Sequence, residues 1–322
     1  MQTLSSYSVY FENEIGKYQF PTTPENLYQP LDYFLRLGGK RIRPLLTLMA
    51  SEMFGLPKEN ALHASMAIEL FHNFSLIHDD IMDKAPLRRG KQTVHLKWND
   101  DIAILSGDVL LIKAYQALAK QQPKHIPALL DMLNQTAVEV CEGQQMDMDF
   151  ESRDQVAIEA YIEMIRLKTS VLLGCALAFG AIVSDAPQKD RELIYAFGQN
   201  LGIAFQIQDD ILDLYGESEI FGKQIGGDII ANKKTLLLIK ALELAQVNPE
   251  SKVEEMLLIE DQALKIETAK SLFNSLGVLA FAREQMANYQ EKALSALNEI
   301  SVSSAKKNTL IDLSKYLFQR EV

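Results

Sequence analysis

The sequence predicts an all-α protein, and three observations support this fold class. Apolar and polar residues almost never alternate over several positions, which is the pattern of strands. Apolar residues instead recur with helical spacing almost continuously from Leu27 to Leu317. The interruptions are short, like the connections of helical bundles. We therefore expect about ten helices around a central cavity. They would form one domain of residues 31–322, preceded by an N-terminal extension of residues 1–30.

The interruptions divide the helical stretch in order along the chain. They are Gly38–Gly39, Gly55–Asn60, Pro86–Thr93, Gln121–Pro127, Phe150–Asp154, Ser184–Lys189, Gly216–Asp228 and Gln246–Ser251. Glycine, proline and short polar residues in these segments end helices or favour turns. No Pro/Ser-rich linker and no short repeat divides the chain, so the helices are expected to form a single bundle.

Composition narrows the classes of function. The chain has 322 residues, 48% of them hydrophobic, which is enough for a large core. A net charge of −11 argues against nucleic acid as the main partner. Cys141 and Cys175 lie beside apolar residues and are expected to be reduced core residues. The N-terminus shows no signal-peptide pattern, and the uncharged run Ser170–Ser184 is too short to span a bilayer. We expect a cytoplasmic protein without stable membrane insertion.

Two acidic clusters, IHDDIMD and IQDDILD, share one pattern and give the strongest functional signal. They contain Asp79, Asp80, Asp83, Asp209, Asp210 and Asp213. On a helix that turns roughly 100° per residue, positions i, i+1 and i+4 face one side, so each cluster gathers three carboxylates. Such crowding costs stability unless a cation neutralises it, and oxygen ligands suit Mg²⁺ bound to a substrate phosphate. A solvated acidic face is the alternative. The apolar segments before both clusters instead place them at the edge of the core, as two walls facing one metal-bridged polyphosphate.

Basic residues accompany both clusters. The segment GGKRIRP places Lys40, Arg41 and Arg43 between a Gly-Gly turn and a proline. Four further cations are Arg88 and Arg89 after the first cluster, and Lys223 and Lys233 after the second. Arginine pairs can bind phosphate oxygens in a fork, although solvated loops would show the same composition. Lys168 lies in an apolar helix, and because a buried lysine is rare unless paired, we expect it to face a cavity.

Seven motifs in this order resemble the trans-isoprenyl diphosphate synthases, or polyprenyl synthetases. The motifs are GGKRIRP, SLIHDDIMD with its following RRG, GDVLL, EGQQMD, KTSVLLG, FQIQDDILD and FGKQIGGDIIANKKT. The match extends over roughly residues 30–322. The resemblance implies an all-α homodimer that condenses isopentenyl diphosphate head-to-tail with an allylic diphosphate. It also implies three Mg²⁺ ions in each active site.

The resemblance also implies roles for individual residues. Mg²⁺ on the allylic diphosphate would be held by Asp79, Asp80, Asp83, Asp209 and Asp213, with Asp210 in the same catalytic cluster. That diphosphate would be contacted by Arg88, Lys168, Lys223 and Lys233. Isopentenyl diphosphate would be held by Lys40, Arg43, His72 and Arg89. Thr169 and Gln206 would face the nascent carbocation, and the departed diphosphate could accept the proton.

Residues before the first cluster concern product length. In the family, bulky side chains on this helix stop chain growth, and here Phe71 and Phe74 precede the cluster with Ser75 after them. This arrangement resembles geranylgeranyl synthases of the archaeal type, and a farnesyl or a longer product is the alternative.

Two more distant interpretations are open. A class I terpene cyclase also uses the first acidic pattern, but the intact second pattern and GGKRIRP argue against it. A non-catalytic partner subunit would be expected to lack ligands, and none is missing here.

Overall fold

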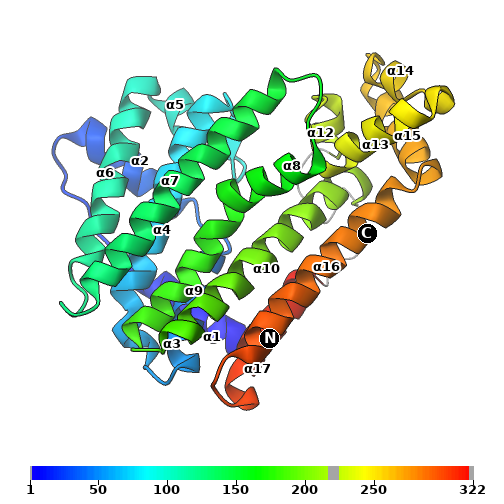
Figure 1. The fold of residues 1–322 in the computed structure, drawn as a ribbon. Helices are drawn as coiled ribbons and strands as arrows, with labels where there is room; N and C mark the ends of the chain where they lie inside the picture. The colour runs from blue at the N-terminus through cyan, green and yellow to red at the C-terminus, as the bar shows by residue number, and fades with distance from the viewer. Residues whose placement is uncertain (1, 217–224, 319–322) are drawn as a thin grey trace. The chain divides into compact units, whose positions relative to one another are not determined.

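The computed structural model describes residues 2–216 and 225–318, and it confirms the all-α prediction (Figure 1). The chain forms two compact units. Unit 1 comprises Met1–Thr136, Leu172–Tyr195 and Ile300–Asp312. Unit 2 comprises Ala137–Val171, Ala196–Glu299 and Leu313–Val322. The first acidic cluster therefore belongs to unit 1 and the second to unit 2.

Unit 1 contains most of the N-terminal elements. They are α1 (Gln2–Gly16), α2 (Glu25–Arg36), α3 (Ile42–Met53), the 3₁₀ turn η1 (Lys58–Ala61), α4 (Leu62–Met82), β1 (Leu87–Arg88), β2 (Lys91–Gln92), α5 (Val94–Lys97), α6 (Asp100–Leu118) and α9 (Val171–Val183). Parts of three longer helices also belong to unit 1, namely α7 (Ile126–Glu151), α10 (Gln188–Tyr215) and α17 (Ser304–Phe318).

Unit 2 holds the remaining parts of these three helices and the elements between them. The elements are α8 (Ile158–Ile165), the π-helix η2 (Arg166–Ser170), α12 (Gly227–Ile230), α13 (Leu236–Val247), the 3₁₀ turn η3 (Pro249–Ser251), α14 (Val253–Leu257), α15 (Gln262–Ser275) and α16 (Val278–Glu299).

The core of unit 1 is built around α4. This helix packs against α3 and α6, and it buries Ile68 and Phe71. Helix α3 is anchored in turn on α9, where the Thr47 hydroxyl donates to the Ala176 carbonyl at 2.8 Å. A Cβ atom at Gly180 would lie 2.4 Å from the Thr47 carbonyl oxygen, so only glycine allows this close approach. The start of α3, which carries Arg43, therefore sits on a rigid base.

The core of unit 2 surrounds the second half of α10. Ile207 and Ile211 of this helix are buried in one cluster with Tyr161, Leu236 and Phe273. The two isoleucines lie on one face of α10, which is buried. Asp209 and Asp213 lie on another face of the same helix and are partly exposed. The core thus places the acidic residues at its border, as the apolar flanks predicted.

Three features differ from the sequence-based expectations. Residues 2–16 form a helix ahead of the predicted helical stretch, and its apolar residues Tyr7, Phe11 and Ile15 are buried at i, i+4 and i+8 spacing. The segment after the first cluster forms a short hairpin, with Leu87 paired to Gln92. The expectation for Cys141 was wrong, because this thiol is exposed whereas that of Cys175 is buried. Apolar neighbours in sequence do not decide which face of a helix a residue occupies.

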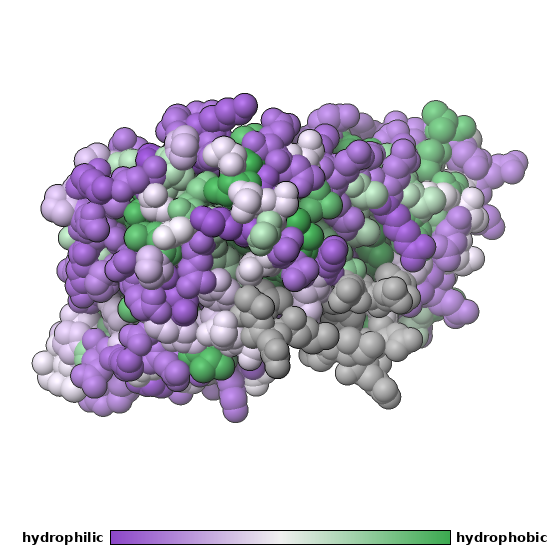
Figure 2. Space-filling view, turned by 90° about the horizontal axis from the view of Figure 1, so that it is seen from below, coloured by the Kyte–Doolittle hydropathy of each residue, from purple (hydrophilic) through white to green (hydrophobic). Residues whose placement is uncertain are grey.

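The surface and the most apolar helical segment bear on the prediction that the protein does not insert stably into a membrane. In Figure 2, hydrophilic residues (purple) cover most of the face shown, with hydrophobic residues (green) in smaller groups. The continuous helical segment Ile158–Val183 is long and apolar enough to cross a membrane, but 83% of its most apolar window is buried within the fold. Burial of this kind is the property of a core helix.

Candidate active site

The first acidic cluster lies at the C-terminal end of α4, where its three carboxylates have different surroundings. Asp80 is 1% exposed, and its Oδ1 accepts hydrogen bonds from Nε and Nη2 of Arg88 at 2.9 and 2.5 Å. Burial raises the pKa of Asp80, and the Arg88 guanidinium partly offsets this. Asp79 is partly buried and Asp83 is exposed. Asp79 and Asp83, one turn apart, are therefore the more accessible pair, while Asp80 holds the hairpin that carries Arg88.

A basic site lies two helical turns before this cluster on α4. Nη1 of Arg43 donates to Nε2 of His72 at 3.0 Å. Burial and nearby arginines lower the pKa of His72 well below its usual value, so the ring is neutral and Nε2 can accept. Burial also lowers the pKa of Arg43 to about 10. Arg89 lies beside Gly39, where a Cβ atom would be 2.7 Å from its Cζ, and its charge contributes to the lowered pKa of both Arg43 and His72. The structure thus brings together Arg43, His72 and Arg89, and Lys40 is exposed on the adjoining turn.

The second acidic cluster lies near the C-terminal end of α10 and shows a similar division of roles. Asp210 is 5% exposed and accepts hydrogen bonds from the Tyr161 hydroxyl and from the Leu236 N–H, the latter at 3.2 Å. Burial raises the pKa of Asp210 to about 7. Oδ2 of Asp213 accepts from the Asp228 N–H at 3.0 Å, in the first turn of α12. Asp210 is therefore an internal anchor, whereas Asp209 and Asp213 are the more accessible pair.

Two lysines of unit 2 converge on one carboxylate that the sequence analysis left without a role. Nζ of Lys168 and Nζ of Lys233 lie 2.6 and 3.5 Å from Oδ2 of Asp147. Burial alone would raise the pKa of Asp147, but Lys233 and Lys168 outweigh it and lower the pKa. Lys168 is therefore paired, whereas the expectation that it faces a cavity stays a prediction. The motif EGQQMD, which ends in Asp147, was the signal for this residue.

The π-helix η2 determines how Lys168 and its neighbour are presented. A Cβ atom at Gly143 would lie 2.2 Å from the backbone nitrogen of Lys168, so α7 approaches η2 backbone to backbone. π-Helical turns inside helices are often found at functional sites. On the same turn, the Thr169 hydroxyl lies 3.5 Å from Oε1 of Gln206. The structure thus brings together the two residues expected to face a carbocation. Lys223, also predicted for this region, lies outside the described residues.

The donor set of the clusters fits a hard divalent cation. Both accessible pairs offer carboxylate oxygens at i and i+4 on one helix, which are the ligands that Mg²⁺ prefers. Among the described residues, no group of three or more Asp, Glu, His or Cys side chains could hold a metal ion by itself. Mg²⁺ typically keeps several waters and is held by one or two carboxylates together with substrate phosphate. Asp79, Asp83, Asp209 and Asp213 are the residues that would hold it.

Comparison with known proteins identifies the family. The sequence model described as polyprenyl synthetase matches residues 24–276. The chain belongs to the polyprenyl synthetase family. Its relatives include the geranylgeranyl pyrophosphate synthase of Geoglobus acetivorans, which is 39% identical over 92% of both chains. The geranylfarnesyl diphosphate synthase of Natronomonas pharaonis is 35% identical over 96% of this chain and 94% of the relative. A solved geranylgeranyl pyrophosphate synthase has 45% identity and a TM-score of 0.94 over the full length of both chains.

The arrangement of α4 within unit 1 agrees with membership of the polyprenyl synthetase family. In unit 1 one helix, α4, carries both the accessible aspartate pair and the His72–Arg43 contact. Because His72 precedes Asp79 by seven residues, about two helical turns, both lie on one face of α4. His72, which Arg43 of α3 contacts, and the accessible aspartate Asp79 therefore lie along one face of α4.

Proposed function

We propose that this polyprenyl synthetase is a trans-prenyltransferase that condenses isopentenyl diphosphate head-to-tail with an allylic diphosphate and releases geranylgeranyl diphosphate as its main product. The observation that carries the proposal is that α4 contributes to two different candidate anion sites, one through His72 and one through its aspartates. Arg43, Arg89 and His72 suit a diphosphate bound directly, whereas Asp79 and Asp83 suit one bound through magnesium. A reaction between two diphosphates needs both kinds of site. The geranylgeranyl synthases among the relatives support this product.

The residues of unit 2 suit the ionisation of the allylic substrate. We assign Asp209 and Asp213, together with the first cluster, to the magnesium ions on the allylic diphosphate, three ions per active site. When bound, magnesium supplies positive charge to the departing diphosphate. Lys168 and Lys233, held in place by Asp147, would stabilise the same developing charge. Arg88 and Lys223 complete the proposed contacts to this diphosphate.

The cation left by ionisation needs oxygen dipoles and protection from water. The Thr169 hydroxyl and the Gln206 side-chain carbonyl lie together on neighbouring helices, and we propose that they face the carbocation. Apolar side chains would line the rest of the cavity and exclude water, which would otherwise quench the cation. We propose that the departed diphosphate accepts the proton released in the last step.

A direct assay tests the proposed function. The purified protein with Mg²⁺ and labelled isopentenyl diphosphate is incubated with dimethylallyl, geranyl or farnesyl diphosphate, and the products are separated by chromatography. We expect elongation of all three primers to a main C20 product. Absence of any labelled prenyl diphosphate with every primer would overturn the proposal.

We further propose that the enzyme is a cytoplasmic homodimer. In unit 1, α6 exposes Ile104, Leu105 and Ile112 to between 43% and 58%. In unit 2, α7 exposes Val138 and Met148 to 59% and 40%. Exposed apolar side chains in such rows favour association with another apolar surface. Sedimentation velocity at micromolar concentration should give twice the chain mass, and a monomer under these conditions would contradict the proposal.

A further inference from the structure

One arginine of the GGKRIRP segment differs from its neighbours because it points into the protein. Arg41 precedes α3 as its N-cap residue, and its side chain is 2% exposed. Its backbone has φ 49°, in the left-handed region that residues other than glycine rarely adopt. Such a conformation persists only where surrounding contacts over-determine it. The contacts of the Arg41 side chain therefore bear on the geometry of the whole turn.

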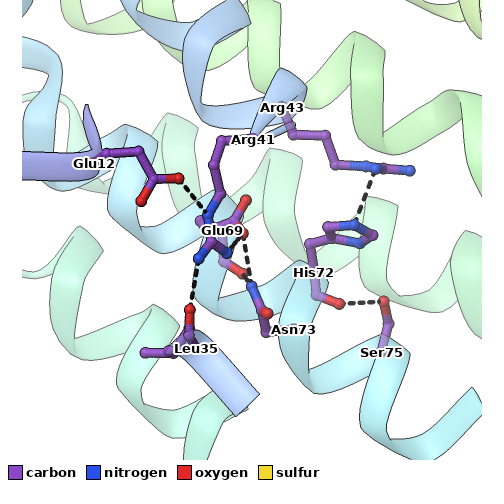
Figure 3. A network of polar contacts seen from close by, with 8 residues as sticks. All are labelled: Glu12, Leu35, Arg41, Arg43, Glu69, His72, Asn73 and Ser75. Carbon is purple, nitrogen blue, oxygen red and sulfur yellow. Dashed lines mark hydrogen bonds and ion pairs between the residues drawn. The ribbon is translucent and has the colours of Figure 1, made fainter. Parts of the chain in front are cut away.

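The guanidinium of Arg41 is held by acceptors from three segments of unit 1 (Figure 3). Nε donates to Oε1 of Glu12 at 3.1 Å, Nη1 to Oε1 of Glu69 at 2.5 Å, and Nη2 to the Leu35 carbonyl at 2.6 Å. Nδ2 of Asn73 donates to the same Glu69 oxygen at 2.8 Å. Each nitrogen of the Arg41 guanidinium thus donates to the protein, whereas a substrate-binding arginine must direct nitrogens to phosphate.

Two contacts join the start of α3 to α4: Arg41 with Glu69, and Arg43 with His72 of the proposed substrate site. Arg41 and Arg43 are two residues apart at the start of α3. Their partners Glu69 and His72 are three residues apart on α4. The Arg41–Glu69 pair therefore fixes where Arg43 can meet His72 (Figure 3). The negative charge of Glu69 also partly offsets the lowering of the Arg43 pKa by burial. A shift of the first pair would move the second.

Helix α1 also contacts α3 and supplies one of the acceptors of Arg41. Its buried residues Tyr7, Phe11 and Ile15 seat it on unit 1, where it contacts α3. The Tyr7 hydroxyl donates to Glu52 near the end of α3, and Glu12 accepts from Arg41 at its beginning. Helix α1 thus holds α3 at both ends. These residues belong to the N-terminal extension that was predicted to lie outside the domain.

We propose that Glu12, Arg41 and Glu69 are positioning residues for isopentenyl diphosphate, and that α1 is thereby part of this substrate site. They set the turn of Gly38 to Lys40 and the first turn of α3, so that Lys40, Arg43 and Arg89 converge before substrate arrives. The inference rests on the proposed function, in which Arg43 holds isopentenyl diphosphate. It adds residues that never touch the substrate and act through Arg41.

Glu12 offers the sharpest test because its side chain is 44% exposed and can be changed without opening the core. The variants are Glu12→Ala and Glu12→Gln, with Glu14→Ala as the matched control. Glu14 is on the same helix and pairs with Lys17 at the surface. We expect Glu12→Ala to raise KM for isopentenyl diphosphate about 3- to 10-fold, the loss typical of one hydrogen bond to a charged partner in a partly exposed position. We also expect kcat and KM for the allylic substrate to change less than about twofold.

Glu12→Gln keeps an acceptor for Nε of Arg41 and should restore most of the KM, and Glu14→Ala should behave like the parent protein. Arg43→Ala provides the scale for losing a direct contact. Calorimetric titration with isopentenyl diphosphate alone should rank the affinities of these variants in the same order as their KM values. Equal changes for both substrates, or an unchanged KM in Glu12→Ala, would overturn the positioning role while leaving the proposed function intact. A parent protein that neither binds nor consumes isopentenyl diphosphate would overturn both.

Discussion

Replacing Asp79 or Asp209 with alanine is expected to lower kcat by about 10²- to 10³-fold, the usual loss when one group that stabilises transition-state charge is removed. Each residue is the first of its cluster and belongs to the accessible pair of its helix. In the proposed reaction, negative charge grows on the diphosphate as its C–O bond breaks. Magnesium held by these carboxylates would meet that charge, so its loss affects the transition state more than substrate binding.

Steady-state kinetics with both substrates, at several magnesium concentrations, measures this effect. Asp312→Ala is a suitable control because Asp312 is exposed on α17. Like each test variant, it removes one negative charge. This control should retain the activity of the parent protein. Chelation by EDTA should abolish turnover, and magnesium should restore it. Full turnover in EDTA would contradict a metal-dependent mechanism and the assignment of both clusters.

The sequence was sufficient to predict the fold class and the helices that contain the two acidic clusters. Helical spacing is a local property, so the position of both acidic clusters near the ends of long helices followed from it. What spacing could not distinguish is which carboxylate of a cluster turns inward. Asp80 does so because the hairpin brings Arg88 beside it, and Asp210 does so because α8 brings Tyr161. Both contacts depend on tertiary structure.

The two positioning carboxylates illustrate the same limit. Asp147 lies 21 residues from Lys168, and Glu12 lies 29 residues from Arg41, so neither pairing has a local signature. An Asp or Glu on a helix is usually solvated, which is why Glu12 gave no signal of its own. Helix α1, which carries Glu12, does have a recognisable sequence signal. Tyr7, Phe11 and Ile15 recur at helical spacing, and buried apolar residues of this kind indicate that a segment packs against a core.

Replacing Phe74 with alanine is expected to lengthen the product from C20 to C25 or more. Phe71 and Phe74 precede the first cluster, with ring centroids 5.6 Å apart, and the Phe74 ring also lies 4.8 Å from that of His78. Helix α4 carries this aromatic row up to Asp79, where the diphosphate end of the allylic substrate is proposed to bind. A tail growing away from the diphosphate would therefore meet the aromatic rings. Removing one opens volume, and filling it gains about 0.8 kcal/mol for each buried methylene of the product.

The two aromatic residues should differ in their effect on stability. Phe71 is 1% exposed, so Phe71→Ala is expected to lower the free energy of unfolding by about 3–5 kcal/mol. Phe74 is only partly buried, and its truncation should cost less. Urea denaturation separates this effect from product length. Phe273→Ala, which truncates a fully buried ring in the core of unit 2, should lose stability without changing the product.

Product chromatography with each primer decides whether the aromatic row limits chain growth. The Phe71→Ala/Phe74→Ala double variant should give longer products than Phe74→Ala alone, because two successive rings leave a longer path for the tail. Ser75, the small residue that follows Phe74, donates its hydroxyl to the His72 carbonyl at 2.9 Å within its own helix. If the double variant still made the C20 product, the stop would lie on another element. The segment of α7 that contains Cys141 and Gly143 would then be the next to test.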